Sequence, residues 1–148
     1  MKKRFKLIAI AFISLISTSL FGSNTDNWET YYENDSIKIE FIYLNCQYIE
    51  QFNSEFVILR ISNYTDNNLN ISWENQLWYD ENCINCETKS EENRKQISIS
   101  PNSRSEGKCN INNNLRLFSK FTEKIEDMPG VKKINILTNF ELTNIQIN

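Results

Sequence analysis

The stretch that decides the fold of this chain is EFVILRISNYTDNNLNISW, residues 55–73. Its first part, residues 55–63, places branched apolar side chains at every second position and has further apolar residues between them. A period of two is typical of a β-strand, and a strand that is apolar on both faces is typical of the centre of a sheet. A polar, Asn-rich turn at 63–68 follows, and alternation resumes over 69–73. The stretch therefore predicts two successive strands joined by an Asx-type turn.

The same alternation predicts strands on both sides of this stretch. They are expected at residues 36–44, 76–80, 95–100 and 134–147. In the last of these segments the apolar phase shifts, which indicates a β-bulge near Asn144. Residues 115–122 fit either a strand or the start of a helix, and the strand is favoured because every neighbouring segment is a strand.

Three aromatic residues, Trp28, Tyr31 and Tyr32, precede the first clear strand. They indicate either an exposed patch for a partner or a short strand or arm that packs on the domain, and the second interpretation is favoured. Seven or eight short strands without a long helix then predict an all-β fold. Within that class we expect an Ig-like antiparallel β-sandwich.

The N-terminus has the pattern of a secretory signal peptide. Four cations within the first six residues precede an apolar run of about 15 residues and a stretch of small residues. Residues 1–22 are the expected signal peptide, with cleavage between 19 and 23, and residues 23–148 form a single β-sandwich domain. An uncleaved anchor is less favoured, because a membrane-spanning helix needs about 20 apolar residues. The sequence thus predicts an exported protein, secreted or periplasmic, with no membrane span after cleavage.

Removal of the signal changes the charge balance. The whole chain has 16 basic and 19 acidic residues, and residues 1–22 contain four of the basic ones. The remaining 12 basic and 19 acidic residues give a formal charge of −7. Nucleic acids and anionic membrane surfaces favour basic partners, so a protein or a glycan is the expected partner. The sequence leaves the identity of that partner, the binding residues and the oligomeric state open, and no cofactor is expected.

Four cysteines form the chemical constellation of the chain: Cys46, Cys83, Cys86 and Cys109. An even number in an exported domain favours two disulfides. We favour a Cys83–Cys86 bridge at a loop tip and a Cys46–Cys109 bridge between distant segments, while a crossed pairing stays open. A Cys-x-x-Cys redox site is less favoured, because no helix N-terminus follows that would lower the thiol pKa. A four-cysteine zinc site is less favoured too, because only one Cys-x-x-Cys pair is present, so no metal is expected.

Residues 55–80, together with the later Cys83/Cys86 pair and the EGKC segment at 106–109, resemble a group of small exported bacterial proteins. The resemblance covers most of the predicted domain. It implies an Ig-like sandwich without an assigned activity, and it brings no catalytic residue. The chain departs from the antibody pattern, because Trp73 lies a whole strand beyond the position expected after Cys46.

The residues that are missing narrow the function further. The chain has no histidine, so no Ser-His-Asp or Cys-His arrangement can form, and its three glycines cannot build a phosphate loop. Paired carboxylates next to a Trp/Tyr-rich strand stay as candidates for carbohydrate chemistry, although the favoured interpretation is that Trp73 packs in the core and the acids are solvated. They are Glu74, Asp80, Glu81 and Glu87. Two glycosylation sequons, at Asn63 and Asn70, are explained by the abundance of asparagine.

The leading hypothesis is an exported, non-enzymatic binding or accessory domain that makes its contact through the loop Asp80–Glu92. Its basis is the sandwich pattern, the disulfides and the lack of a catalytic constellation. The alternatives are a thiol-disulfide oxidoreductase at Cys83 and Cys86, or a carbohydrate-active protein.

Overall fold

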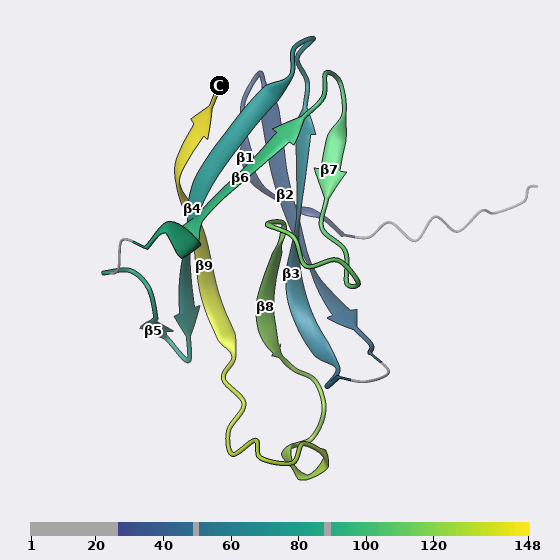
Figure 1. The fold of residues 1–148 in the computed structure, drawn as a ribbon, viewed down its shortest axis with the longest axis vertical. Helices are drawn as coiled ribbons and strands as arrows, with labels where there is room; N and C mark the ends of the chain where they lie inside the picture. The colour runs from purple at the N-terminus through teal and green to yellow at the C-terminus, as the bar shows by residue number, and fades with distance from the viewer. Residues whose placement is uncertain (1–26, 49–50, 88–89) are drawn as a thin grey trace, which may run out of the picture.

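The computed structural model of the chain describes residues 27–48, 51–87 and 90–148. The predicted signal peptide and its cleavage positions lie outside these residues. Nine strands and two short 3-10 turns make up the described chain (Figure 1). Their bounds are β1 (Glu29–Glu33), β2 (Ile37–Cys46), β3 (Ser54–Asn63), β4 (Leu69–Tyr79), β5 (Asn82–Cys83), η1 (Glu91–Asn93), β6 (Arg94–Ile99), β7 (Arg104–Glu106), β8 (Arg116–Phe121), η2 (Ile125–Asp127) and β9 (Leu137–Ile147).

The strands form two antiparallel sheets, which confirms the predicted all-β class. In the first sheet β2 lies between β1 and β3, and both β7 and β8 pair with the other edge of β3. In the second sheet β4 is central, with β9 on one edge and β5 and β6 on the other. The prediction of a central strand at 55–63 is confirmed, because β3 has paired neighbours on both edges.

The main core lies between the two sheets and follows the predicted alternation. Its fully buried members include Ile39, Leu59 and Ile61 from the first sheet and Ile71 and Trp73 from the second. Sequestering such side chains from water stabilises the fold by about 1.5–3 kcal/mol each. The alternation that predicted the strands is thus the pattern that places one face of each strand in this core.

A second, smaller cluster lies on the outer face of the first sheet. Cys46, Phe56 and Ile58 are buried there, under a cover that includes Trp28 and Tyr48. This cluster explains why β3 is apolar on both faces: one face meets the second sheet, and the other meets this cover. Because the Arg60 guanidinium lies 4.1 Å from the Trp28 ring centroid, the N-terminal aromatic arm packs on the domain, as the favoured interpretation predicts.

The strand predicted at 115–122 forms as β8, and helical structure in this region is limited to the 3-10 turn at 125–127. The bulge predicted near Asn144 is confirmed, because Asn144 has a φ of 52° and the β4–β9 register shifts beside it. The prediction of separate strands at 69–73 and 76–80 is wrong, because β4 runs through both without interruption. Asn75, which looks like a break, is buried in the strand, and its Oδ1 accepts the Trp73 indole N–H at 2.9 Å.

Candidate functional site

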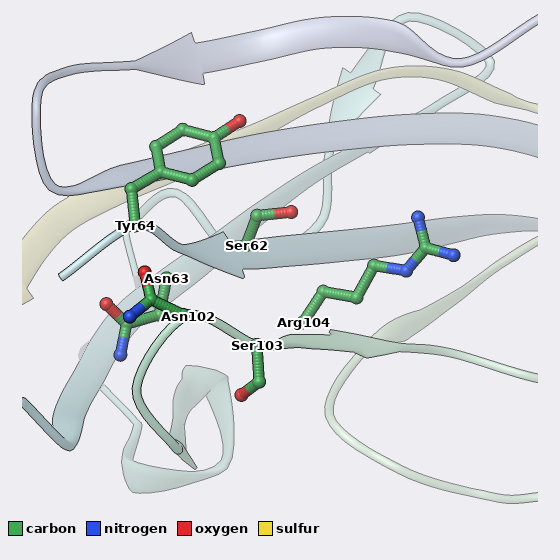
Figure 2. Close-up of a pocket in the computed structure, with 6 residues that line it drawn as sticks. All are labelled: Ser62, Asn63, Tyr64, Asn102, Ser103 and Arg104. Carbon is green, nitrogen blue, oxygen red and sulfur yellow. The ribbon is translucent and has the colours of Figure 1, made fainter. Parts of the chain in front are cut away.

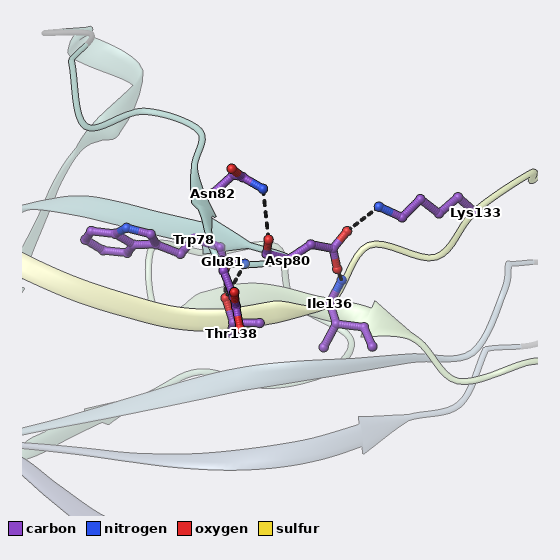
Figure 3. A network of polar contacts seen from close by, with 7 residues as sticks. All are labelled: Trp78, Asp80, Glu81, Asn82, Lys133, Ile136 and Thr138. Atoms are coloured by element: carbon purple, nitrogen blue, oxygen red, sulfur yellow. Dashed lines mark hydrogen bonds and ion pairs between the residues drawn. The ribbon is translucent and has the colours of Figure 1, made fainter.

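The predicted contact loop begins at a tight turn at the end of β4. Asp80 and Glu81 have φ angles of 48° and 68°, and two successive positive φ angles define a type I′ hairpin turn. The carboxylate of Asp80 accepts hydrogen bonds from Lys133 Nζ at 2.6 Å and from the Ile136 N–H at 3.1 Å (Figure 3). The hydrogen bond from Lys133 holds the pKa of Asp80 below its ordinary value, and the bond from the backbone acts in the same direction. The turn is thereby fixed to the segment that leads into β9.

The tip of the loop is fixed by a disulfide and by one asparagine. Cys83 and Cys86 are paired, with their Cα atoms 5.8 Å apart. Between them, Asn85 Oδ1 accepts the Leu77 N–H at 2.9 Å, and Asn85 Nδ2 donates to the Asn75 carbonyl at 2.9 Å. A side chain that lies between the two cysteines therefore holds the tip of the loop against β4 of the second sheet. Sequence reasoning missed Asn85, because nothing marks it among so many asparagines.

A polar groove lies next to this loop on the outer face of the second sheet. It consists of two adjoining hollows of about 360 Å³ each. The first is lined by Glu74, Asn75, Gln76, Asn85, Cys86, Ser90, Glu91, Asn93, Arg94 and Asn144. The second shares Glu74, Arg94 and Asn144 with it. The stapled loop thus forms one wall of the groove, and strands of the second sheet form its floor.

Arg94 supplies the positive charge among the described residues that line the groove. It stands directly opposite Glu74 in the β4–β6 register, yet within the described residues no ion pair joins the two side chains. The Glu74 carboxylate instead accepts a hydrogen bond from Asn144 Nδ2 at 3.1 Å. Asn144 at the bulge therefore engages one oxygen of Glu74, and the Arg94 guanidinium stays exposed at the groove with donors to offer.

Another hollow, of about 340 Å³, lies at the opposite end of β4 (Figure 2). Figure 2 shows the ring of Tyr64 and the side chain of Arg104 pointing in different directions, so the two do not converge on one point. Asn63, which lies between them in the lining of this hollow, is 1% exposed. Its amide donates to the carbonyls of Asn67, Ile99 and Ser100, and its oxygen accepts from Thr65. A buried, fully engaged amide is no glycan acceptor, whereas Asn70 of the other sequon is exposed.

The four carboxylates considered for catalysis have separate surroundings. Asp80 is engaged by Lys133 and Glu74 by Asn144, while Glu81 and Glu87 are exposed. In the part of the chain that the structure describes, no group of three or more acidic or cysteine side chains is arranged to hold a metal ion.

The remaining cysteine pair lies outside the main core. Cys46 at the end of β2 is bonded to Cys109, with a Cα–Cα distance of 5.4 Å, and both belong to the cluster on the outer face of the first sheet. The structure thus brings together both of the favoured pairs. An antibody domain instead joins its two sheets through its bridge, and this difference arises because the β7–β8 connection folds back over the outer face of β3.

Comparison with protein-family models, with curated protein sequences and with solved structures finds no match for this chain. No described helix is both long enough and apolar enough to cross a membrane.

Proposed function

We propose that this chain is an exported, non-enzymatic binding domain of Ig-like β-sandwich type, which holds its ligand in the polar groove beside the stapled loop. The observation that carries the proposal is the exposed Arg94 guanidinium, left without an ion pair in the described residues at a groove with a braced wall. The signal-like N-terminus and the two bonded cysteine pairs support export, because disulfides persist in oxidising compartments.

Binding is favoured over catalysis by the state of the reactive side chains. Arg94 offers donors to a ligand, and the Asn144 amide holds one oxygen of the Glu74 carboxylate, which fixes that carboxylate in place as a hydrogen-bond acceptor. The Cys83–Cys86 pair lies between the β5 end and η1 rather than at the start of an α-helix, so the helix-terminal stabilisation of a thiolate is missing. A pre-formed, rigid wall also lowers the ordering cost of association.

A photo-crosslinking experiment tests the position of the contact. A diazirine-bearing residue replaces Ile84, which is 60% exposed at the loop tip, in one variant and Gln96, on the outer face of β6, in another. Each exported variant is then irradiated in its native cells. The matched control carries the same residue at Ser100, which is exposed at the other end of the sheet. We expect adducts from the first two positions and none from the third. Equal adducts from all three, or none from the two positions that flank the groove, would contradict the proposal.

The oxidoreductase alternative has its own test. Insulin reduction by the protein is compared with that by a Cys83→Ser variant, and we expect equal, background rates. A rate that depends on Cys83 would replace the binding proposal with thiol–disulfide chemistry.

A further inference from the structure

The side chains of the groove point to a carbohydrate. None of the ten residues that line the first hollow has an aliphatic or aromatic side chain. Protein interfaces of ordinary type have a core enriched in aromatic residues and methionine, and the first hollow provides no apolar socket for such an anchor. The second hollow adds Trp73 and Ile145 to its lining, but Trp73 is 1% exposed and belongs to the core. We infer that the groove binds a neutral oligosaccharide, an inference that rests on the proposed binding function.

The groove presents hydrogen-bonding groups suited to sugar hydroxyls. A hydroxyl both donates and accepts, so a sugar ring is recognised by donors and acceptors held side by side. Arg94 supplies donors, and the Gln76 amide supplies both kinds of group. Glu74 and Asn144 fix each other through one hydrogen bond. In the described residues the Glu74 Oε1 and the Asn144 Oδ1 accept no further hydrogen bond and stay open as acceptors.

An aromatic surface lies on the same face of β4. Leu77 and Tyr79 pack toward the core, so the alternation of the strand directs Trp78 outward, on the side of Glu74 and Gln76. The Trp78 indole N–H has no hydrogen-bond partner among the described residues. Sugar rings present C–H faces that pack against an indole, and an aromatic ring with a polar N–H combines apolar contact area with a donor. Trp78 lines neither hollow, but its place two residues after Gln76 on this face of β4 offers a stacking surface for a sugar that continues beyond the groove.

The charge of the site favours a neutral sugar over an acidic one. Glu74 and Glu91 line the first hollow with one cation, Arg94, and the predicted domain carries a formal charge of −7. A polyanionic glycan would approach against this field. The size of the groove agrees with a short segment of an oligosaccharide, because hollows of about 360 Å³ are at the low end of the range for small-molecule sites.

The test is titration calorimetry of the exported protein with neutral hexasaccharides (of glucose, mannose, xylose and N-acetylglucosamine) and with a heparin hexasaccharide. We expect saturable binding of at least one neutral sugar and weaker binding of heparin. Arg94→Ala should weaken that binding by about tenfold or more, because hydrogen bonds from a charged group are stronger than those between neutral groups. The matched control is Arg104→Ala, which removes an exposed arginine from the first position of β7 and should change the affinity less than about twofold.

Gln76→Ala and Trp78→Phe are measured alongside, with thermal melting to show that each variant is folded. Equal affinity of the wild type and the Arg94→Ala variant, or a preference for heparin, would overturn the assignment. If no sugar binds while groove crosslinks to a protein are obtained, the glycan inference fails and the binding function survives. If both experiments are negative, both proposals fail.

Discussion

The two disulfides differ in how much they are expected to stabilise the domain, and their loop lengths give the magnitude. The Cys46–Cys109 bridge has a sequence separation of 63, whereas the Cys83–Cys86 bridge has a separation of 3. In the chain-entropy treatment, closing loops of these lengths destabilises the unfolded state by about 4 and about 2 kcal/mol, respectively. Since a domain of this size has a total stability of about 5–15 kcal/mol, loss of the first bridge alone should remove about a quarter of that stability or more.

The comparison uses paired alanine substitutions, so that no odd thiol is left. Cys46 is 1% exposed and packs with Phe56 and Ile58, so its truncation adds a cavity cost of about 1 kcal/mol. The tip bridge has no such term, because Cys86 is exposed. We therefore expect losses of about 5 kcal/mol for the Cys46→Ala/Cys109→Ala pair and about 2 kcal/mol for the Cys83→Ala/Cys86→Ala pair.

Urea unfolding at pH 7, followed by tryptophan fluorescence and analysed by linear extrapolation, measures both free energies. The m-value is compared as well, because a longer free loop should make the unfolded state more expanded. If the tip pair cost as much as the long-range pair or more, the loop-closure reasoning would be refuted, and the stapled loop would be an integral part of the cooperative core.

Three further predictions concern single side chains. Asn63→Ala should destabilise the protein by about 3–5 kcal/mol in urea unfolding, because it leaves several backbone groups without their hydrogen-bond partner. The control is Asn70→Ala at an exposed position, which should cost under about 1 kcal/mol. Equal losses of stability in the two variants would contradict the role of Asn63. Asp80→Asn retains a residue suited to positive φ and removes the charge that Lys133 binds. Because the folded pKa of Asp80 is depressed, its stabilisation is present above pH ~4 and is lost as the pH falls further; a wild-type advantage that persisted through acid would be evidence against this role. Tyr79→Phe should cost about 1 kcal/mol at pH 7, since the Tyr79 hydroxyl donates a 2.6 Å hydrogen bond to a backbone carbonyl. Burial raises the pKa of Tyr79, so the wild type should lose this advantage as the pH rises above about 10; an unchanged difference at pH 11 would disprove it.

Alternation along the chain predicted the longer strands and the bulge, because burial of a strand residue recurs at every second position. It did not predict the short strands β5 and β7, which have two and three residues and are too short to show a period. It failed at Asn75, whose polarity suggests a break although its partner is Trp73, two residues away in the same strand. It could not reveal the groove, because Arg94 and Glu74 become neighbours only through the β4–β6 register. Nor could it show that Asn144, predicted as a bulge, would donate a hydrogen bond to the Glu74 carboxylate. These arrangements depend on strand pairing, which a single sequence does not encode locally.

A comparison of the two outer faces of the sandwich-like fold indicates which of them binds the ligand. An apolar outer face exists on the first sheet, but it is closed: Phe56 and Ile58 are buried beneath a cover tied down by the Cys46–Cys109 bridge. The outer face of the second sheet is polar and hollowed, and the other bridge braces a loop beside it rather than over it. A domain that bound partners through apolar contact would be expected to expose the first face and not to cover it. The placement of the two bridges therefore favours recognition through hydrogen bonds on the second sheet, where Arg94 is the side chain whose removal decides the question.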